Sequence, residues 1–90
     1  MSQFKLVPTK QFKKDAKKQW QSLLDNDWIT VLGCLINGET MPKKYRDHSL
    51  TGDYRDYREC HIKPDMLLIY RQDGDEICLF RLGTHSELFG

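Results

Sequence analysis

The sequence predicts a small α+β domain, with a strand and two helices packed on a mainly antiparallel sheet. Two segments with helical apolar spacing occupy residues 10–37, and three strand-like segments separated by turn signals occupy residues 54–82. Helices followed by a run of antiparallel strands are typical of the α+β class. Ninety residues bury too little apolar surface for a second core, so we expect one domain over residues 1–90.

A short strand and a basic helix are expected at the start of the chain. Residues 4–7 predict a strand that Pro8 ends, and Thr9 is a suitable N-cap for a helix over residues 10–21. Phe12, Ala16 and Trp20 recur every four residues, so we expect them to form one buried stripe. A second face carries five lysines: Lys10, Lys13, Lys14, Lys17 and Lys18. This face is either a solvated surface or a contact for a polyanion.

Asn26 or Asp27 is expected to cap a second helix, which ends at Asn37-Gly38. Its apolar residues, from Trp28 onward, recur at helical spacing. The link over residues 22–26 is short, which predicts an antiparallel helical hairpin. The polar stretch over residues 39–53 then predicts a long loop, which contains His48 and the basic residues Lys43, Lys44 and Arg46.

The rest of the chain predicts a three-stranded meander with a short tail. Residues 54–62 alternate, residues 66–71 are apolar on both faces as in a central strand, and residues 76–82 return after the turn signal Asp73-Gly74. Thr84 is expected to cap a final turn that ends at Leu88-Phe89.

Composition narrows the classes of function. The three cysteines are odd in number and form no CxxC pair, which favours neither a disulfide framework nor a zinc site. No apolar run approaches the roughly 20 residues of a membrane-spanning helix, and the first residues lack the apolar block of a secretory signal. We therefore expect a soluble, cytoplasmic protein without a membrane partner. Residues 1–24 hold six lysines and one acid, so this cationic end could contact RNA or an acidic protein.

The three histidines are the candidate catalytic residues. If the strands form a meander, His61 and Asp65 lie at the same sheet edge as Arg81 and His85. Two or three imidazoles with a carboxylate and a guanidinium suit RNA cleavage without a metal, because imidazole serves as acid or base near neutral pH. Three competing interpretations are a surface role for the histidines, an ion pair of Arg81 with an acid such as Glu59, and a metal site with Asp65. The histidine spacings match no short zinc motif, so we expect neither metal nor cofactor.

Four collinear segments resemble a known family. Residues 45–50 (YRDHSL), 57–65 (YRECHIKPD), 68–70 (LIY) and 83–90 (GTHSELFG) are similar to YafQ-type toxins of the RelE superfamily. The resemblance extends more weakly through both predicted helices. It implies the RelE-like fold and a metal-independent endoribonuclease, the toxin of a type II toxin–antitoxin pair, that cleaves mRNA in the ribosomal A site.

The resemblance also implies a set of site residues and partners. It assigns catalysis to His48, His61, Asp65 and His85, with His85 as the general acid and the base shared among the others. Arg81 and Phe89 would contact RNA, and the lysines named above with Arg46 would contact phosphates of 16S rRNA. The implied partners are a cognate antitoxin, the 70S ribosome and mRNA, with operator DNA bound through the antitoxin.

One position departs from the pattern of the family, and two other functions compete. Met66 stands where the family often has a tryptophan, which would alter contact with a nucleotide. The alternatives are a non-catalytic toxin of the same fold that inhibits gyrase, as ParE does, and an RNA-binding, ribosome-associated module. The histidine set favours the endoribonuclease.

Overall fold

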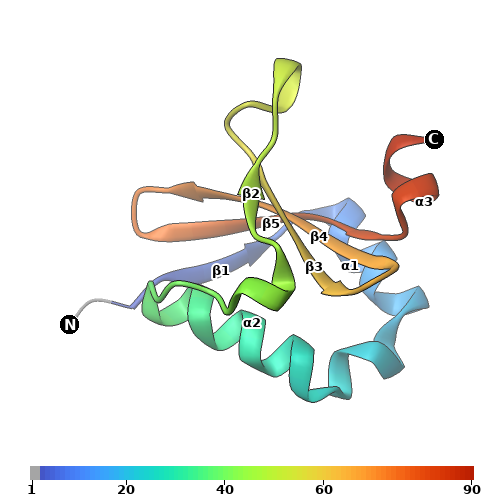
Figure 1. Ribbon diagram of the computed structural model, residues 1–90, viewed down its shortest axis with the longest axis horizontal. Helices are drawn as coiled ribbons and strands as arrows, with labels where there is room; N and C mark the ends of the chain where they lie inside the picture. The colour runs from blue at the N-terminus through green and yellow to red at the C-terminus, as the bar shows by residue number, and fades with distance from the viewer. Residues whose placement is uncertain (1–2) are drawn as a thin grey trace.

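The structure is a computed structural model that describes residues 3–90 (Figure 1). Its strands are β1 (Lys5–Pro8), β2 (His48–Ser49), β3 (Arg58–Lys63), β4 (Met66–Asp73) and β5 (Glu76–Gly83). Its α-helices are α1 (Lys10–Lys18), α2 (Asn26–Asn37) and α3 (His85–Phe89). Three 3-10 helices complete it: η1 (Trp20–Leu24), η2 (Lys43–Tyr45) and η3 (Gly52–Tyr54). The predicted α+β class is confirmed.

The five strands form one sheet in the order β1-β5-β4-β3-β2. β1 runs parallel to β5, and every other neighbouring pair is antiparallel. The predicted meander is formed by β3, β4 and β5. Cys60, Leu68 and Leu82 lie side by side on β3, β4 and β5 and are at most 2% exposed. They pack in one core with Phe12, Trp28 and Val31 of the helices, so α1 and α2 cover this face of the sheet.

The opposite face of the sheet carries a different row of side chains. Glu59, Ile69 and Arg81 are direct partners across β3, β4 and β5, and His61 is the partner of Leu67 in the next row. Leu67 and Ile69 are 1% and 2% exposed, although they lie outside the helix-side core. This face is therefore a buried apolar floor with polar side chains around it.

The first helix is shorter than predicted. α1 ends at Lys18, with Gln19 as its C-cap, and Trp20 begins η1 instead of continuing the helix. The change of helical type turns Trp20 away from the stripe of Phe12 and Ala16, and 57% of its surface is exposed. The prediction that Trp20 is buried is therefore wrong. The 3-10 helix η1 links α1 to α2. The two helices are in contact through Phe12 and Trp28, whose stacked rings have centroids 6.2 Å apart.

The ends of α2 follow capping rules. Its N-cap is Asp25, whose carboxylate accepts a hydrogen bond from the Asp27 amide at 2.8 Å. The prediction that Asn26 or Asp27 caps this helix is therefore wrong. Gly38 ends the helix with a φ of 66°, the left-handed conformation predicted for this position.

The predicted loop over residues 39–53 is largely structured. It contains η2, the start of η3 and the two-residue strand β2, so His48 lies on a strand and not in a loop. Asp47 holds this segment to the sheet, because its carboxylate accepts hydrogen bonds from Arg58 Nη2 at 3.1 Å and Tyr70 Oη at 2.6 Å. The third strand correspondingly begins at Arg58, later than the predicted residue 54, because η3 and a turn precede it.

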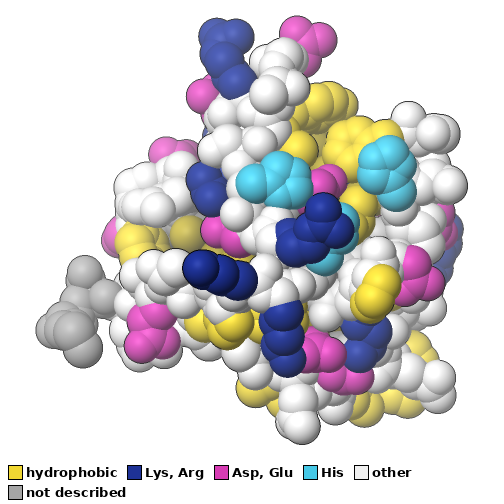
Figure 2. All heavy atoms as spheres, viewed as in Figure 1, with side chains coloured by type: hydrophobic (Ala, Val, Ile, Leu, Met, Phe, Trp, Pro, Cys, Tyr) yellow, Lys and Arg dark blue, Asp and Glu magenta, His cyan; other side chains and the backbone are white. Residues whose placement is uncertain are grey.

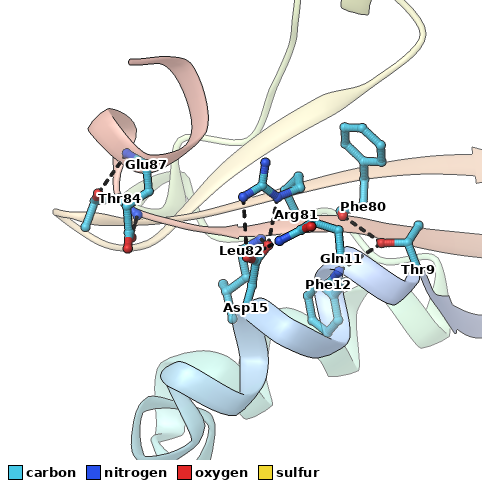
Figure 3. Close-up of polar contacts among 9 residues, drawn as sticks. All are labelled: Thr9, Gln11, Phe12, Asp15, Phe80, Arg81, Leu82, Thr84 and Glu87. Atoms are coloured by element: carbon cyan, nitrogen blue, oxygen red, sulfur yellow. Dashed lines mark hydrogen bonds and ion pairs between the residues drawn. The ribbon is translucent and has the colours of Figure 1, made fainter.

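Residues of α1 complete the edge of β5 beyond the end of β1 (Figure 3). Thr9 donates through its amide to the Leu79 carbonyl (3.0 Å) and through Oγ1 to the Phe80 carbonyl (2.9 Å). The Asp15 carboxylate accepts from the Leu82 amide at 3.0 Å and from Arg81 Nε at 2.8 Å. Burial raises the pKa of Asp15, but the hydrogen bonds from Arg81, Leu82 and Gln11 outweigh it, so the net pKa lies below the usual value.

Within residues 3–90, no helix combines the length and the apolar character needed to cross a membrane.

The edge of β5 generates a stability prediction. Asp15→Ala leaves the Arg81 guanidinium and the Leu82 amide without their acceptor, so we expect the free energy of unfolding to fall by about 3 kcal/mol. Because the folded pKa of Asp15 is below its unfolded value, this stabilisation is present above about pH 4 and is lost as the pH falls through the folded pKa. Urea unfolding at pH 7 and at low pH measures both effects. Asp56→Ala, at an exposed carboxylate, is the control; equal stability of the two variants at pH 7 would contradict the prediction.

Candidate active site

A nearly buried carboxylate joins two of the predicted histidines. Glu59 on β3 is 7% exposed, and its Oε2 lies 3.2 Å from His48 Nε2 and 3.5 Å from His61 Nε2. His48 comes from β2, directly opposite Glu59, and His61 lies two residues further along the same face of β3. The two imidazole centroids are 6.2 Å apart. A buried carboxylate needs such partners, so Glu59 fixes both rings.

His48 is held from both sides. Its Nδ1 lies 2.6 Å from the carbonyl oxygen of Arg46 and its Nε2 lies 3.2 Å from the Glu59 carboxylate, so both ring nitrogens face oxygens that can only accept a hydrogen bond. Among residues 3–90, Arg46 is the one non-glycine residue with a positive φ, at 52°. Such backbone strain concentrates at functional sites. Here it places the carbonyl that orients His48.

His61 also faces an open cleft that contains His85 and Asp65. The cleft has a volume of about 370 Å³ and is lined by His61, Pro64, Asp65, Leu67, Thr84, His85 and Ser86. His61 comes from β3, Asp65 from the turn between β3 and β4, and His85 from the first position of α3. The sequence prediction placed these three residues at one sheet edge, and the structure brings them together. Histidine side chains gather on the face shown in Figure 2.

The helix α3 positions His85 and Phe89 after the last strand. Thr84 and Glu87 form a capping box: the Glu87 amide donates to Thr84 Oγ1, and the Thr84 amide donates to Glu87 Oε1 (Figure 3). At Gly83 an added Cβ would lie 3.0 Å from Glu87 Oε1, so a side chain there would obstruct this turn. The His85 and Phe89 rings lie 5.1 Å apart, and Phe89 is 40% exposed.

Arg81 is not part of the cleft lining. Two of its guanidinium nitrogens, Nε and Nη2, donate to Asp15, which raises the pKa of Arg81. The alternative that Arg81 pairs with an acid is confirmed, but the acid is Asp15 and not Glu59, because Ile69 separates Arg81 from Glu59 in the cross-strand row. Arg81 instead lies between α1 and α3, beside Lys18 and Glu87.

The predicted basic residues occupy two separate surfaces. The five lysines of α1 are all exposed, and the acid among them, Asp15, is engaged by Arg81. Lys43 and Lys44 lie on η2, and Arg46 follows directly; all three are exposed. Lys44 is 3.5 Å from Asp27.

Two features of the site were missed from sequence or differ from expectation. Glu59 was not among the predicted catalytic residues, although it shares one strand face with His61. Met66, which occupies a position where a tryptophan was expected to contact a nucleotide, is 7% exposed and belongs to the helix-side core.

The arrangement is suited to proton transfer next to a phosphate. The Glu59 carboxylate lies 3.5 Å from His61 Nε2, which favours a hydrogen on Nε2 and leaves Nδ1 of that ring available as a base, while the exposed His85 lines the same cleft and is available as an acid. One imidazole held by a carboxylate and a second imidazole nearby supply the two groups that general acid–base catalysis needs.

Comparisons with known proteins identify the family and agree with this fold. The model of the YafQ family, described as the bacterial toxin of a type II toxin–antitoxin system, matches residues 4–90. A putative YafQ toxin of Haemophilus influenzae is 37% identical, with 92% of this chain and 89% of the relative covered. The mRNA interferase toxin YafQ of Escherichia coli K12 is 35% identical, with 89% of each chain covered.

Solved structures show the same architecture. A copper-bound mutant toxin from Helicobacter pylori superposes with a TM-score of 0.88 and 41% identity, covering 96% of this chain and 99% of the other. The E. coli YafQ toxin in complex with DinJ superposes with a TM-score of 0.84 and 34% identity, covering 98% and 99%. This chain belongs to the YafQ family of type II toxin–antitoxin toxins.

Proposed function

We propose that this chain, an mRNA interferase toxin by family, cleaves ribosome-bound message with His61, His85 and Glu59 at the centre of its active site. The observation that carries the proposal is that His61 and His85, from β3 and α3, line one cleft, with the buried Glu59 carboxylate against His61. The substrate is RNA, because the attacking group is the 2′-hydroxyl, which DNA lacks.

In the proposed reaction, His61 Nδ1 removes the proton of the 2′-oxygen. That oxygen then forms a bond to the neighbouring phosphorus, and the bond from phosphorus to the 5′-oxygen of the next nucleotide breaks. His85 gives its proton to the leaving 5′-oxygen, so the products are a 2′,3′-cyclic phosphate and a 5′-hydroxyl. His48, held between Glu59 and the Arg46 carbonyl, stabilises charge on the phosphorane, and Asp65 orients groups in the cleft.

The proposed macromolecular contacts follow from the exposed charges. The five lysines of α1 and Lys43 contact phosphates of 16S rRNA as the toxin enters the A site of the 70S ribosome, which places its action in the cytoplasm. Arg81 and Phe89 flank the RNA near α3, where the Phe89 ring can stack on a base. A cognate antitoxin inhibits the toxin, as the E. coli DinJ–YafQ complex suggests, and brings the pair to operator DNA.

The role of His85 generates the first functional prediction. We expect His85→Ala to lower cleavage of ribosome-bound mRNA by about 10²- to 10⁴-fold, because the leaving oxygen loses its acid. Mapping 5′ ends of translated mRNA after brief expression measures the loss, and the thermal unfolding midpoint checks the fold. A His85→Ala variant that still arrests growth fully would point to gyrase inhibition or to RNA binding alone.

The Glu59–His61 contact generates a second prediction. Glu59→Gln keeps the shape of the side chain but replaces an acceptor-only carboxylate with an amide that presents either an oxygen or an NH₂ group, so His61 is no longer held in one orientation, and we expect single-turnover cleavage to fall about 10²-fold. The unfolding midpoint should change little. Glu76→Gln, at an exposed glutamate of β5, is the matched control. Equal rates for the two variants would remove Glu59 from the mechanism.

The lysines of α1 generate a third prediction. Changing Lys13, Lys14 and Lys17 together to glutamate should weaken ribosome binding and flatten its salt dependence, because each lost phosphate contact removes a slope of roughly 0.9. Sedimentation with ribosomes over a range of salt concentrations measures both quantities. Lys5→Glu, on β1 outside this helix face, is the control. An unaltered affinity for the triple variant would show that these lysines are only solvated.

A further inference from the structure

A second hollow lies on the other side of His61 from the cleft. It has a volume of about 410 Å³, and its lining includes Asp27, Lys44, Arg46, His61, Lys63 and Pro64. His61 and Pro64 also line the cleft with His85, so the two depressions share a wall. We call the second depression the basic hollow. Lysine and arginine side chains lie beside the histidines on the face shown in Figure 2.

The charges of the basic hollow are unequally satisfied. Lys63 Nζ is bound by the carboxylates of both Asp25 and Asp27, and Lys44 Nζ lies 3.5 Å from Asp27. A hydrogen bond from Tyr45 and the nearby lysines hold the pKa of Asp27 below its usual value. Asp27 is therefore an anion already engaged by three donors. The Arg46 guanidinium, in contrast, makes no hydrogen bond or ion pair among the contacts of residues 3–90.

The backbone explains why Arg46 remains available. Its left-handed conformation, with φ 52° and ψ 43°, follows η2 and turns the chain toward β2. The same residue gives its carbonyl to His48 Nδ1 and contributes to the lining of the basic hollow. A planar guanidinium that is exposed and without a protein partner matches two oxygens of one phosphate.

We propose that the basic hollow binds the nucleotide of the cut RNA strand that adjoins the scissile phosphate, with its phosphate on Arg46 and Lys44. An RNA strand lying in the cleft between His61 and His85 must continue past His61, and the basic hollow is the depression that adjoins it there. The inference rests on the proposed active site. It separates Arg46 and Lys44, which contact the message, from the α1 lysines, which contact the ribosome.

A phosphate of ribosomal RNA has the same chemistry, so the test is made with short RNA away from the ribosome. The probes are a dinucleotide and a tetranucleotide of 2′-O-methyl RNA, which cannot be cleaved because the attacking hydroxyl is blocked. Amide chemical shifts of the ¹⁵N-labelled full chain give both dissociation constants. We expect the tetranucleotide to bind about tenfold more tightly than the dinucleotide. We also expect it to change the amide chemical shifts of Tyr45 and Lys63, which the dinucleotide does not change.

The matched variants isolate the guanidinium. Arg46→Gln should reduce the tenfold advantage of the tetranucleotide to about twofold, and Arg46→Lys should restore part of it. Arg55→Gln removes an exposed arginine outside the basic hollow and should leave the advantage unchanged. Equal losses for Arg46→Gln and Arg55→Gln, or no shifts at Tyr45 and Lys63, would overturn the proposal.

The same spectra separate this inference from the active site on which it rests. If the dinucleotide shifts the amides of Thr84 and Ser86 but the tetranucleotide adds nothing at the basic hollow, the cleft stands and the basic hollow does not bind the message. If neither RNA perturbs Thr84 or Ser86, the proposed active site itself fails. The thermal unfolding midpoint of each variant verifies that the fold is retained.

Discussion

The Glu59 carboxylate is the interaction on which the active site depends. It lies on β3 with 7% of its surface exposed, and a carboxylate in that position is stable only with hydrogen-bonding or charged partners. His48 and His61 are those partners, at 3.2 and 3.5 Å. One acidic side chain therefore joins β2 to β3 and fixes the orientation of two imidazoles. Because the buried Glu59 needs both histidines as partners, the free energy cost of its burial also determines where the two imidazoles lie.

The pairing of the strands sets how far His85 lies from His61. Antiparallel pairing of β3, β4 and β5 places His61 beside Leu67 and places Leu67 beside Gly83, so α3 starts two strands away from His61. The position of His85 therefore depends on how firmly the end of β5 is held. Asp15 and Thr9 of the α1 segment provide that support by satisfying the edge of β5 beyond β1. A residue of the first helix, outside the lining of the cleft, thus contributes to the position of His85, the proposed general acid.

Periodic segments were predictable from the sequence, and features that depend on distant partners were not. The strands of the meander, the turn at Gly74 and the cap at Thr84 each carry a local signal, and all are present. β2 has only two residues and its sequence shows no alternation, so no local signal predicts it. It is held in the sheet by Asp47, which binds partners on β3 and β4. Trp20 continued a four-residue spacing, but the helix ended at Lys18 before reaching it. The gathering of His61, Asp65 and His85 was predictable from strand order, whereas the roles of Glu59 and Arg81 required the cross-strand register.

The proposed mechanism requires Glu59 to orient His61 so that Nε2 carries the hydrogen and Nδ1 is free to act as the base. Long-range ¹H–¹⁵N correlation spectra of the imidazole side chains, recorded at alkaline pH, measure this directly. The account predicts the Nε2–H tautomer for His61 in the wild-type chain and a mixture of tautomers in Glu59→Gln. A dominant Nδ1–H tautomer for His61 in the wild-type chain would contradict it.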